Sequence, residues 1–164
     1  MSLMLKHSIL IWAIVLHHTQ VHENQSPRVI EAYHRSQGRK GLAYHYYIEQ
    51  DGTISVGHGL DYRGEHSLGR NNGTIGVCLS GDFQGKTNPS DAQLQALVNV
   101  CALIKKSDLA SPDIKILTHK ELMRIRVGSY KPIFTYDCPG NLKDHLVKYV
   151  NRVQRAQARQ EEAK

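Results

Sequence analysis

A continuous apolar run near the amino terminus, residues 9–16, constrains the fold more than any other feature, and a His-His pair follows it directly. Together with Lys6 the run imitates a secretory signal peptide, but no small-x-small cleavage site stands ahead of the histidines. A run of this length is also typical of a strand that is buried on both faces of a sheet. We therefore predict a central buried strand that leads into His17 and His18.

Length and charge limit the class of protein. The 164 residues suit one domain of about 100–200 residues, and they contain no stretch of about 20 apolar residues, so we expect no membrane span. The formal net charge of +6 favours anionic partners such as nucleic acid, acidic lipid or bacterial cell wall. Aromatic residues make up only 7% of the chain and no basic-aromatic platform stands out, so we expect no nucleic-acid partner.

Turn and capping signals divide the rest of the chain into helices and strands. Asp51-Gly52, between two β-rich stretches, is a strong hairpin signal and requires at least one antiparallel strand pair. Ser90 and Gln93 form a capping-box pattern at the start of an amphipathic helix. In chain order we expect a helix over 27–37, strands over 42–50, 53–56 and 74–79, a helix after Ser90, a short strand over 114–118 and a final helix after Gly140.

This order of elements predicts an α/β fold with a mixed β-sheet flanked by helices, in a single domain. The Gly-rich stretch 57–73 is expected to be a long surface loop, of the kind that often carries function. We expect the domain to cover residues 5–153 and residues 154–164 to form a polar C-terminal tail that frays.

Three potential metal ligands stand where predicted elements meet loops: His17 and His119 at strand ends, and Cys138 before the final helix. Two imidazoles and one thiolate suit Zn²⁺, and three protein ligands leave a fourth position open, as in catalytic zinc sites. Their spacing matches no short metal signature, and a single histidine at a strand end is more often structural than a ligand. Cys78 and Cys101 lie in apolar patterns and are expected in the core.

Four motifs follow one another along the chain. They are His17-His18-Thr19, Tyr44-His45 with Asp51-Gly52-Thr53, Asn72 with Ile75-Gly76-Val77 and Gly81, and His119 with Asp137-Cys138-Pro139-Gly140. In this order they resemble the motifs of the type-2 N-acetylmuramoyl-L-alanine amidases, a family that includes phage endolysins and peptidoglycan recognition proteins. The resemblance covers about residues 9–150.

The resemblance implies helices on both faces of the sheet and a zinc site made by His17, His119 and Cys138. It implies cleavage of the amide bond between the lactyl group of muramic acid and the L-alanine of the stem peptide. The substrate would be peptidoglycan or its muramyl peptides. We expect a monomer that is cytoplasmic before its release to the cell wall, as a phage lysin is, with an extracellular location as the alternative. His18 should point to the opposite face of the sheet from His17, away from the metal.

Further site residues follow from the same resemblance. Tyr44 matches a tyrosine that polarises the substrate carbonyl, although Tyr also suits a strand for packing reasons. His66 and Asn72 match positions near the substrate groove and are expected to contact substrate. Many family members carry a lysine two residues before the last zinc ligand, where this chain has Tyr136. Either Tyr136 replaces the lysine as a catalytic donor, a loop residue such as Lys131 does so, or turnover is slower.

Two other functions stay open from the sequence. A module that binds muramyl peptides without cutting them would share the fold, although family members of that kind typically lack the cysteine ligand. In the other alternative Cys138 is a nucleophile activated by His119, as in cysteine peptidases of the cell wall.

Overall fold

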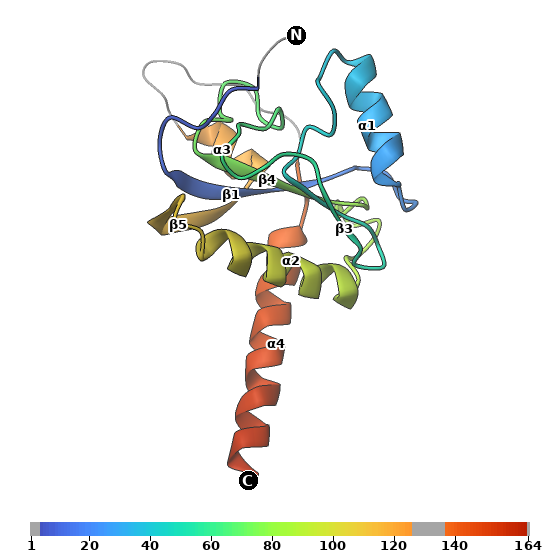
Figure 1. Ribbon diagram of the computed structural model, residues 1–164. Coiled ribbons are helices and arrows are strands. Elements are labelled where there is room, and N and C mark those ends of the chain that lie inside the picture. The colour runs from blue at the N-terminus through green and yellow to red at the C-terminus, as the bar shows by residue number, and fades with distance from the viewer. Residues whose placement is uncertain (1–3, 126–136, 164) are drawn as a thin grey trace.

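A five-stranded mixed sheet forms the centre of the computed structural model, which describes residues 4–125 and 137–163 (Figure 1). In chain order the strands are β1 (Ile11–His18), β2 (Tyr46–Ile48), β3 (Ile54–Val56), β4 (Thr74–Leu79) and β5 (Ala110–Thr118). Their order across the sheet is β3-β2-β4-β1-β5. Only the β2–β3 pair is antiparallel among the described strands, so the predicted mixed sheet is confirmed.

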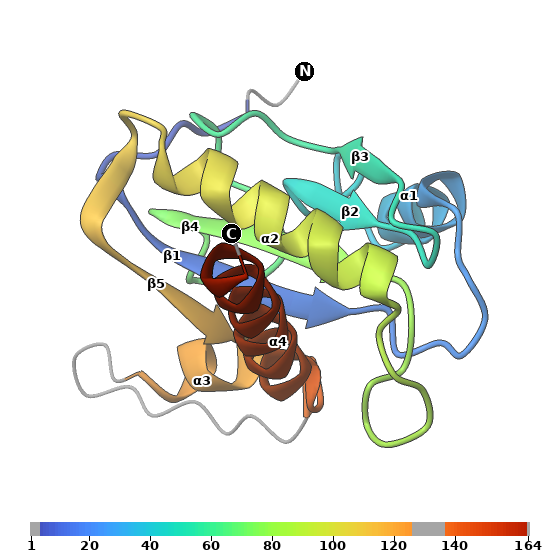
Figure 2. The same cartoon turned by 90° about the horizontal axis from the view of Figure 1, so that it is seen from below.

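Helices cover both faces of this sheet, as expected (Figures 1 and 2). The helices α1 (Pro27–Ser36) and α3 (His119–Arg124) lie on one face, and α2 (Asp91–Lys105) and α4 (Leu142–Glu162) lie on the other. The second half of α4 extends away from the rest of the molecule (Figure 1). None of the helices in the described ranges combines the length and the apolar character that crossing a membrane requires.

The apolar run of the sequence is the central strand β1, and its side chains alternate between the two cores. Ile14 and Leu16 belong to the larger cluster on the α2 and α4 face. Ala13 and Val15 pack with Leu122 of α3 on the opposite face. All four β1 side chains are 0% exposed, so the run is buried on both faces as predicted. The same alternation places His17 on the α1 and α3 face and His18 on the other.

The predicted hairpin forms at Asp51-Gly52, but its strands are shorter than expected. Gly52 has a φ of 88°, which favours glycine, and β2 pairs with β3 over three residues. Residues 42–45 lie ahead of β2. In this segment the backbone N–H of Ala43 donates to His34 Nδ1 of α1, whereas that of His45 donates to the Gly76 carbonyl of β4. Tyr44 therefore lies in an irregular segment close to α1.

Two expectations for the C-terminal third were wrong. Residues 119–124, where no helix was expected between the strand at 114–118 and the final helix, form α3, which Thr118 and Glu121 cap with a capping box. Residues beyond Arg152, expected to fray, continue α4 to Glu162, since this segment consists largely of Ala, Gln, Arg and Glu, which are strong helix formers. The capping box at Ser90 and Gln93 was predicted and is confirmed.

Candidate metal centre

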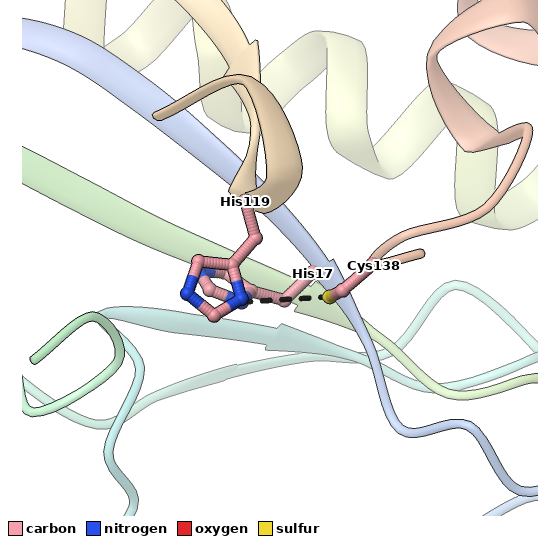
Figure 3. Close-up of side chains that lie close together, drawn as sticks. All are labelled: His17, His119 and Cys138. Carbon is pink, nitrogen blue, oxygen red and sulfur yellow. Dashed lines mark hydrogen bonds between the residues drawn. The ribbon is translucent and has the colours of Figure 1, made fainter. Parts of the chain in front are cut away.

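His17, His119 and Cys138 converge from three separate elements (Figure 3). His17 lies near the end of β1, His119 begins α3 directly after β5, and Cys138 lies in the turn that precedes α4. The strands β1 and β5 are parallel neighbours with Leu16 opposite Thr118. The next residue of each chain segment is a histidine, so the register of the sheet brings the two imidazoles together.

The separations between these side chains fit a single metal ion. One potential ligand atom from each residue lies within 4.8 Å of the other two. Nδ1 of His17 is 3.8 Å from Sγ of Cys138, and the ring centroids of His17 and His119 are 4.5 Å apart. Bond lengths of about 2.0–2.3 Å in tetrahedral geometry require neighbouring ligand atoms to lie about 3.5 Å apart. The predicted ligand set can therefore hold a tetrahedral ion with little movement.

Ion pairs and backbone contacts hold the Cys138 turn against α3. Lys120 donates through its backbone N–H to the Cys138 carbonyl at 3.1 Å and through Nζ to Asp137 Oδ1 at 2.8 Å. Gly140 has a φ of 64°, and a Cβ at this position would collide with the Phe83 carbonyl. The Asp-Cys-Pro-Gly motif thus fixes the sulfur beside the residue that follows His119.

Burial keeps both histidines neutral. It lowers the pKa of His17 well below its usual value, and the neighbouring His119 and His66 add to this effect. Burial also lowers the pKa of His119 to about 4. Neutral imidazoles present lone pairs near pH 7, as metal ligation requires.

The pKa of the Cys138 thiol is shifted in the opposite direction, upward. Burial raises the pKa of Cys138 to about 12, although the backbone of His18 lowers it slightly. A cysteine nucleophile normally has a depressed pKa, produced by an adjacent cation or base. The environment of Cys138 does not provide that shift, whereas a bound metal ion would deprotonate the thiol directly.

Tyr44 lies at the edge of the same site. Its ring centroid is 5.2 Å from that of His17 and 5.3 Å from that of His34. Burial raises the pKa of Tyr44 well above its usual value, and Cys78 and Cys138 raise it further. The phenol is therefore protonated near pH 7 and can donate a hydrogen bond, which in this structure is directed at the Cys78 thiol.

The other predicted site residues have different surroundings. His66 is 7% exposed and its Nδ1 lies 3.0 Å from Nε2 of His17. Asn72 bonds with both the backbone N–H and the hydroxyl of Ser8, which anchors the N-terminal segment. Substrate contacts for His66 and Asn72 stay predictions. Tyr136 and Lys131 lie outside the described residues.

His18 and the remaining cysteines lie where the sequence predicted. His18 points away from the metal ligands, and its Nδ1 accepts a hydrogen bond from the Phe83 backbone N–H at 3.2 Å. Cys78 and Cys101 are buried in two different core clusters.

Sequence reasoning missed one charged group near the site, the half-buried Arg39 just after α1. Its guanidinium is close enough to lower the pKa of both His17 and Tyr44, although each effect is smaller than that of burial. Arg39 lies in a polar connection between a helix and a loop. In a single sequence nothing distinguishes such an arginine from the polar residues beside it, so its position near the site could not be predicted.

Residues 8–141 match the family model described as N-acetylmuramoyl-L-alanine amidase. The chain belongs to this amidase family. The match contains His17 and His119 from the two strand ends and Cys138 from the turn before α4.

Endolysins and animal amidases are among the relatives of the family found by sequence. The endolysin of Klebsiella phage KP32 is 38% identical over 82 residues, which cover 48% of this chain and 54% of that protein. The endolysin of Escherichia phage T7 is 39% identical over 83 residues, covering 48% and 55%. The N-acetylmuramoyl-L-alanine amidase of Homo sapiens is 29% identical over 125 residues, covering 74% and 19%. The chain thus spans about half the length of the phage relatives that it matches.

Solved structures share the fold over most of the chain. The amidase LysC from Clostridium intestinale has a TM-score of 0.70 at 26% identity, and the match covers 87% of each chain. The Drosophila recognition protein PGRP-LB has a TM-score of 0.73 at 21% identity, covering 88% of this chain and 84% of that chain. At 21% identity, the similarity to PGRP-LB shows a shared fold alone.

Proposed function

We propose that this protein is a zinc-dependent amidase that cleaves the bond between the lactyl group of N-acetylmuramic acid and L-alanine in peptidoglycan. The single observation that carries the proposal is the convergence of His17, His119 and Cys138 within the fold of the amidase family. The solved amidase LysC, at 26% identity, supports the same reaction class.

The donor set suits zinc better than a hard cation such as Mg²⁺, because it contains two imidazoles and a thiol and no carboxylate. When bound, zinc supplies a Lewis acid that polarises a carbonyl and lowers the pKa of water to about 7, which is the chemistry that amide hydrolysis needs.

The protein's own residues provide orientation and proton donation. Tyr44 keeps its phenolic proton, so its hydroxyl can donate to the lactyl carbonyl oxygen as negative charge develops there. The leaving amine of L-alanine must also receive a proton before it departs. We keep Tyr136 as the proposed catalytic donor in the position of the family lysine, and His66 and Asn72 as proposed substrate contacts.

The alternatives are less well supported. A recognition module without catalysis does not need the cysteine ligand, which this chain has in position beside His17. A Cys138 nucleophile is disfavoured because burial raises the pKa of its thiol to about 12. We further propose that the enzyme acts as a monomer on the cell wall after release from the cytoplasm, since endolysins are among its relatives.

Metal analysis and product analysis together test the proposal. Elemental analysis of the purified protein should give one zinc per chain. Mass spectrometry of digested peptidoglycan should show free stem peptides that begin with L-alanine, and intact glycan strands. Cleavage within the stem peptide would support the cysteine peptidase instead. Binding to cell wall with neither zinc nor released peptides would support the recognition module.

Tyr44→Phe tests the proposed hydroxyl donor. The variant keeps the ring that packs near His17 and His34 but removes the O–H. We expect kcat to fall by about 10²–10³-fold, the usual loss when one oxyanion donor is removed, while zinc content and thermal stability stay unchanged. Activity measured on soluble muropeptides checks this. A kcat equal to that of the wild type would reduce Tyr44 to a packing residue.

A further inference from the structure

His17 has a second hydrogen-bonding partner on the side of its ring that faces away from the other ligands. Its Nδ1 lies 3.8 Å from Cys138 Sγ, whereas its Nε2 lies 3.0 Å from Nδ1 of His66. His66 comes from the connection between β3 and β4 and is 7% exposed. The orientation of the His17 ring is therefore fixed from both sides.

The contacts of His66 continue as a directed chain of hydrogen bonds. Its Nε2 lies 3.5 Å from the Thr74 hydroxyl, and that hydroxyl donates to the Arg70 carbonyl at 2.7 Å. If Nδ1 of His17 keeps a lone pair for a metal, its Nε2 carries the proton and donates to His66. His66 then carries its own proton on Nε2, facing Thr74. In this arrangement every donor in the hydrogen-bond series from His17 to the Arg70 carbonyl has an acceptor.

Glycines on two sides make room for the His66 ring. A Cβ at Gly76 of β4 would lie 2.5 Å from Cγ of His66, and a Cβ at Gly64 would lie 2.8 Å from its Cδ2. The Ser67 hydroxyl, 3.1 Å from His66 Nδ1, adds a further contact at the same nitrogen. The imidazole thus occupies a fitted position between the loop and the sheet.

The loop that supports His66 also contacts the helix that carries the second histidine ligand. Arg70, whose carbonyl ends the hydrogen-bond chain from His17, donates through its guanidinium to the carbonyl of Ile125 at the end of α3. Arg70 therefore bonds both to Thr74, which contacts His66 behind His17, and to the end of α3, which carries His119.

We propose that His66 is a positioning residue, which holds His17 in the tautomer that leaves Nδ1 free for the metal and which fixes the ring through Thr74 and Arg70. This role rests on the proposed zinc centre. Partners of this kind behind a metal-bound histidine raise its basicity and restrict its rotation, and their loss typically weakens metal binding by about 10–100-fold.

A pair of variants that share a side chain branched at Cγ separates hydrogen bonding from packing. His66→Leu fills space but cannot accept the His17 Nε2 proton, whereas His66→Asn offers an amide oxygen near the position of the lost Nδ1. We would measure the zinc dissociation constant of each variant by competition with a chromophoric chelator, and the visible absorption spectrum of the Co²⁺-loaded protein. His58→Gln is the matched control, because His58 is also buried in this loop and its ring lies against His45.

We expect the leucine variant to bind zinc about 10–100-fold more weakly and to show an altered Co²⁺ spectrum. The asparagine and His58→Gln variants should stay close to the wild type. Equal zinc affinity of the leucine variant and the wild type, or equal losses in the leucine and asparagine variants, would overturn the role of His66. If His66→Leu does not fold, Thr74→Val is the test, because it keeps the His66 imidazole and removes the hydroxyl that lies at its Nε2. Weaker zinc binding by this variant would support the role of His66, and unchanged zinc binding would contradict it. A wild type that binds no zinc would overturn the metal centre as well.

Discussion

Replacing His17 by alanine is expected to abolish zinc binding and the hydrolysis of muropeptides together. The substitution removes one of three ligand atoms that lie within 4.8 Å of one another, and two remaining ligands cannot define a tetrahedral site. The loss of activity should be larger than the loss of about 10–100-fold that is typical when only a hydrogen-bonding partner of a metal ligand is removed. Elemental analysis and the rate of L-alanine peptide release measure the two effects on the same sample.

Cys138→Ala should behave in the same way, and two controls make the comparison specific. His22→Ala removes an exposed histidine, and Cys101→Ala removes a buried thiol from the core; both should keep zinc and activity. Circular dichroism should show that both ligand variants keep the fold, since the ligands lie at element ends and not within the larger core cluster. Cys101 belongs to that cluster, but its replacement by alanine removes only the sulfur atom, so this control and the exposed His22→Ala should keep the fold as well.

Chelation and thiol alkylation then distinguish the metal enzyme from a cysteine peptidase. A zinc enzyme loses activity to a chelator and recovers with added zinc, and alkylation after zinc loading has little effect because the thiolate is coordinated. Activity that survives the chelator but not alkylation would contradict the role of Cys138 as a ligand.

The sequence predicted the parts of the site that depend on strand periodicity and on motif order. A fully apolar run indicated a doubly buried strand, and the alternation of side chains along it assigned His17 and His18 to opposite faces, as the structure confirms. The convergence of the three ligands rested on the family resemblance, because their spacing alone carried no metal signature. The sheet register explains it: Leu16 lies opposite Thr118, so each following residue is a ligand.

Contacts between distant side chains could not be predicted in the same way. The His17–His66 hydrogen bond depends on how the loop between β3 and β4 folds back over β4, and no periodicity encodes that path. Helix α3 was missed although Thr118 and Glu121 carry its capping-box pattern, because the helix is only six residues long and has little apolar periodicity. The extension of α4 was missed because polarity was given more weight than the helix propensity of Ala, Gln, Arg and Glu.

Acid should destabilise this protein strongly between about pH 6.5 and pH 4, before most carboxylates are protonated. The reason is a set of buried histidines whose ring nitrogens accept backbone N–H groups. His45, 0% exposed, accepts from Gly76 N–H at 3.0 Å and has its other ring nitrogen 2.9 Å from the Tyr62 carbonyl. His34 accepts from Ala43 N–H at 3.0 Å. Burial lowers the pKa of His45 to about 3 and that of His34 to about 4.

The sign of the effect follows from proton linkage. The unfolded chain binds protons at these histidines below about pH 6.5 while the folded chain does not, so the free energy of unfolding falls as the pH falls. For His45 alone the loss between pH 7.5 and pH 4.5 is about 3 kcal/mol, a large part of the about 5–15 kcal/mol that stabilises a typical domain. Burial also disfavours protonation of His34, so its contribution has the same sign.

Urea unfolding of the metal-free protein at several pH values tests this prediction without a contribution from zinc binding. His45→Asn is the informative variant, because its amide oxygen can still accept from Gly76 N–H but does not titrate. It should lower the stability at pH 7.5 through imperfect packing and show a smaller loss of stability on going to pH 4.5. Carboxylates with lowered pKa, such as Asp82 and Glu121, contribute only below about pH 4.5, so they do not account for a loss in this window. Equal stability of the wild type at pH 7.5 and pH 4.5 would show that its buried histidines accept protons without breaking their backbone hydrogen bonds.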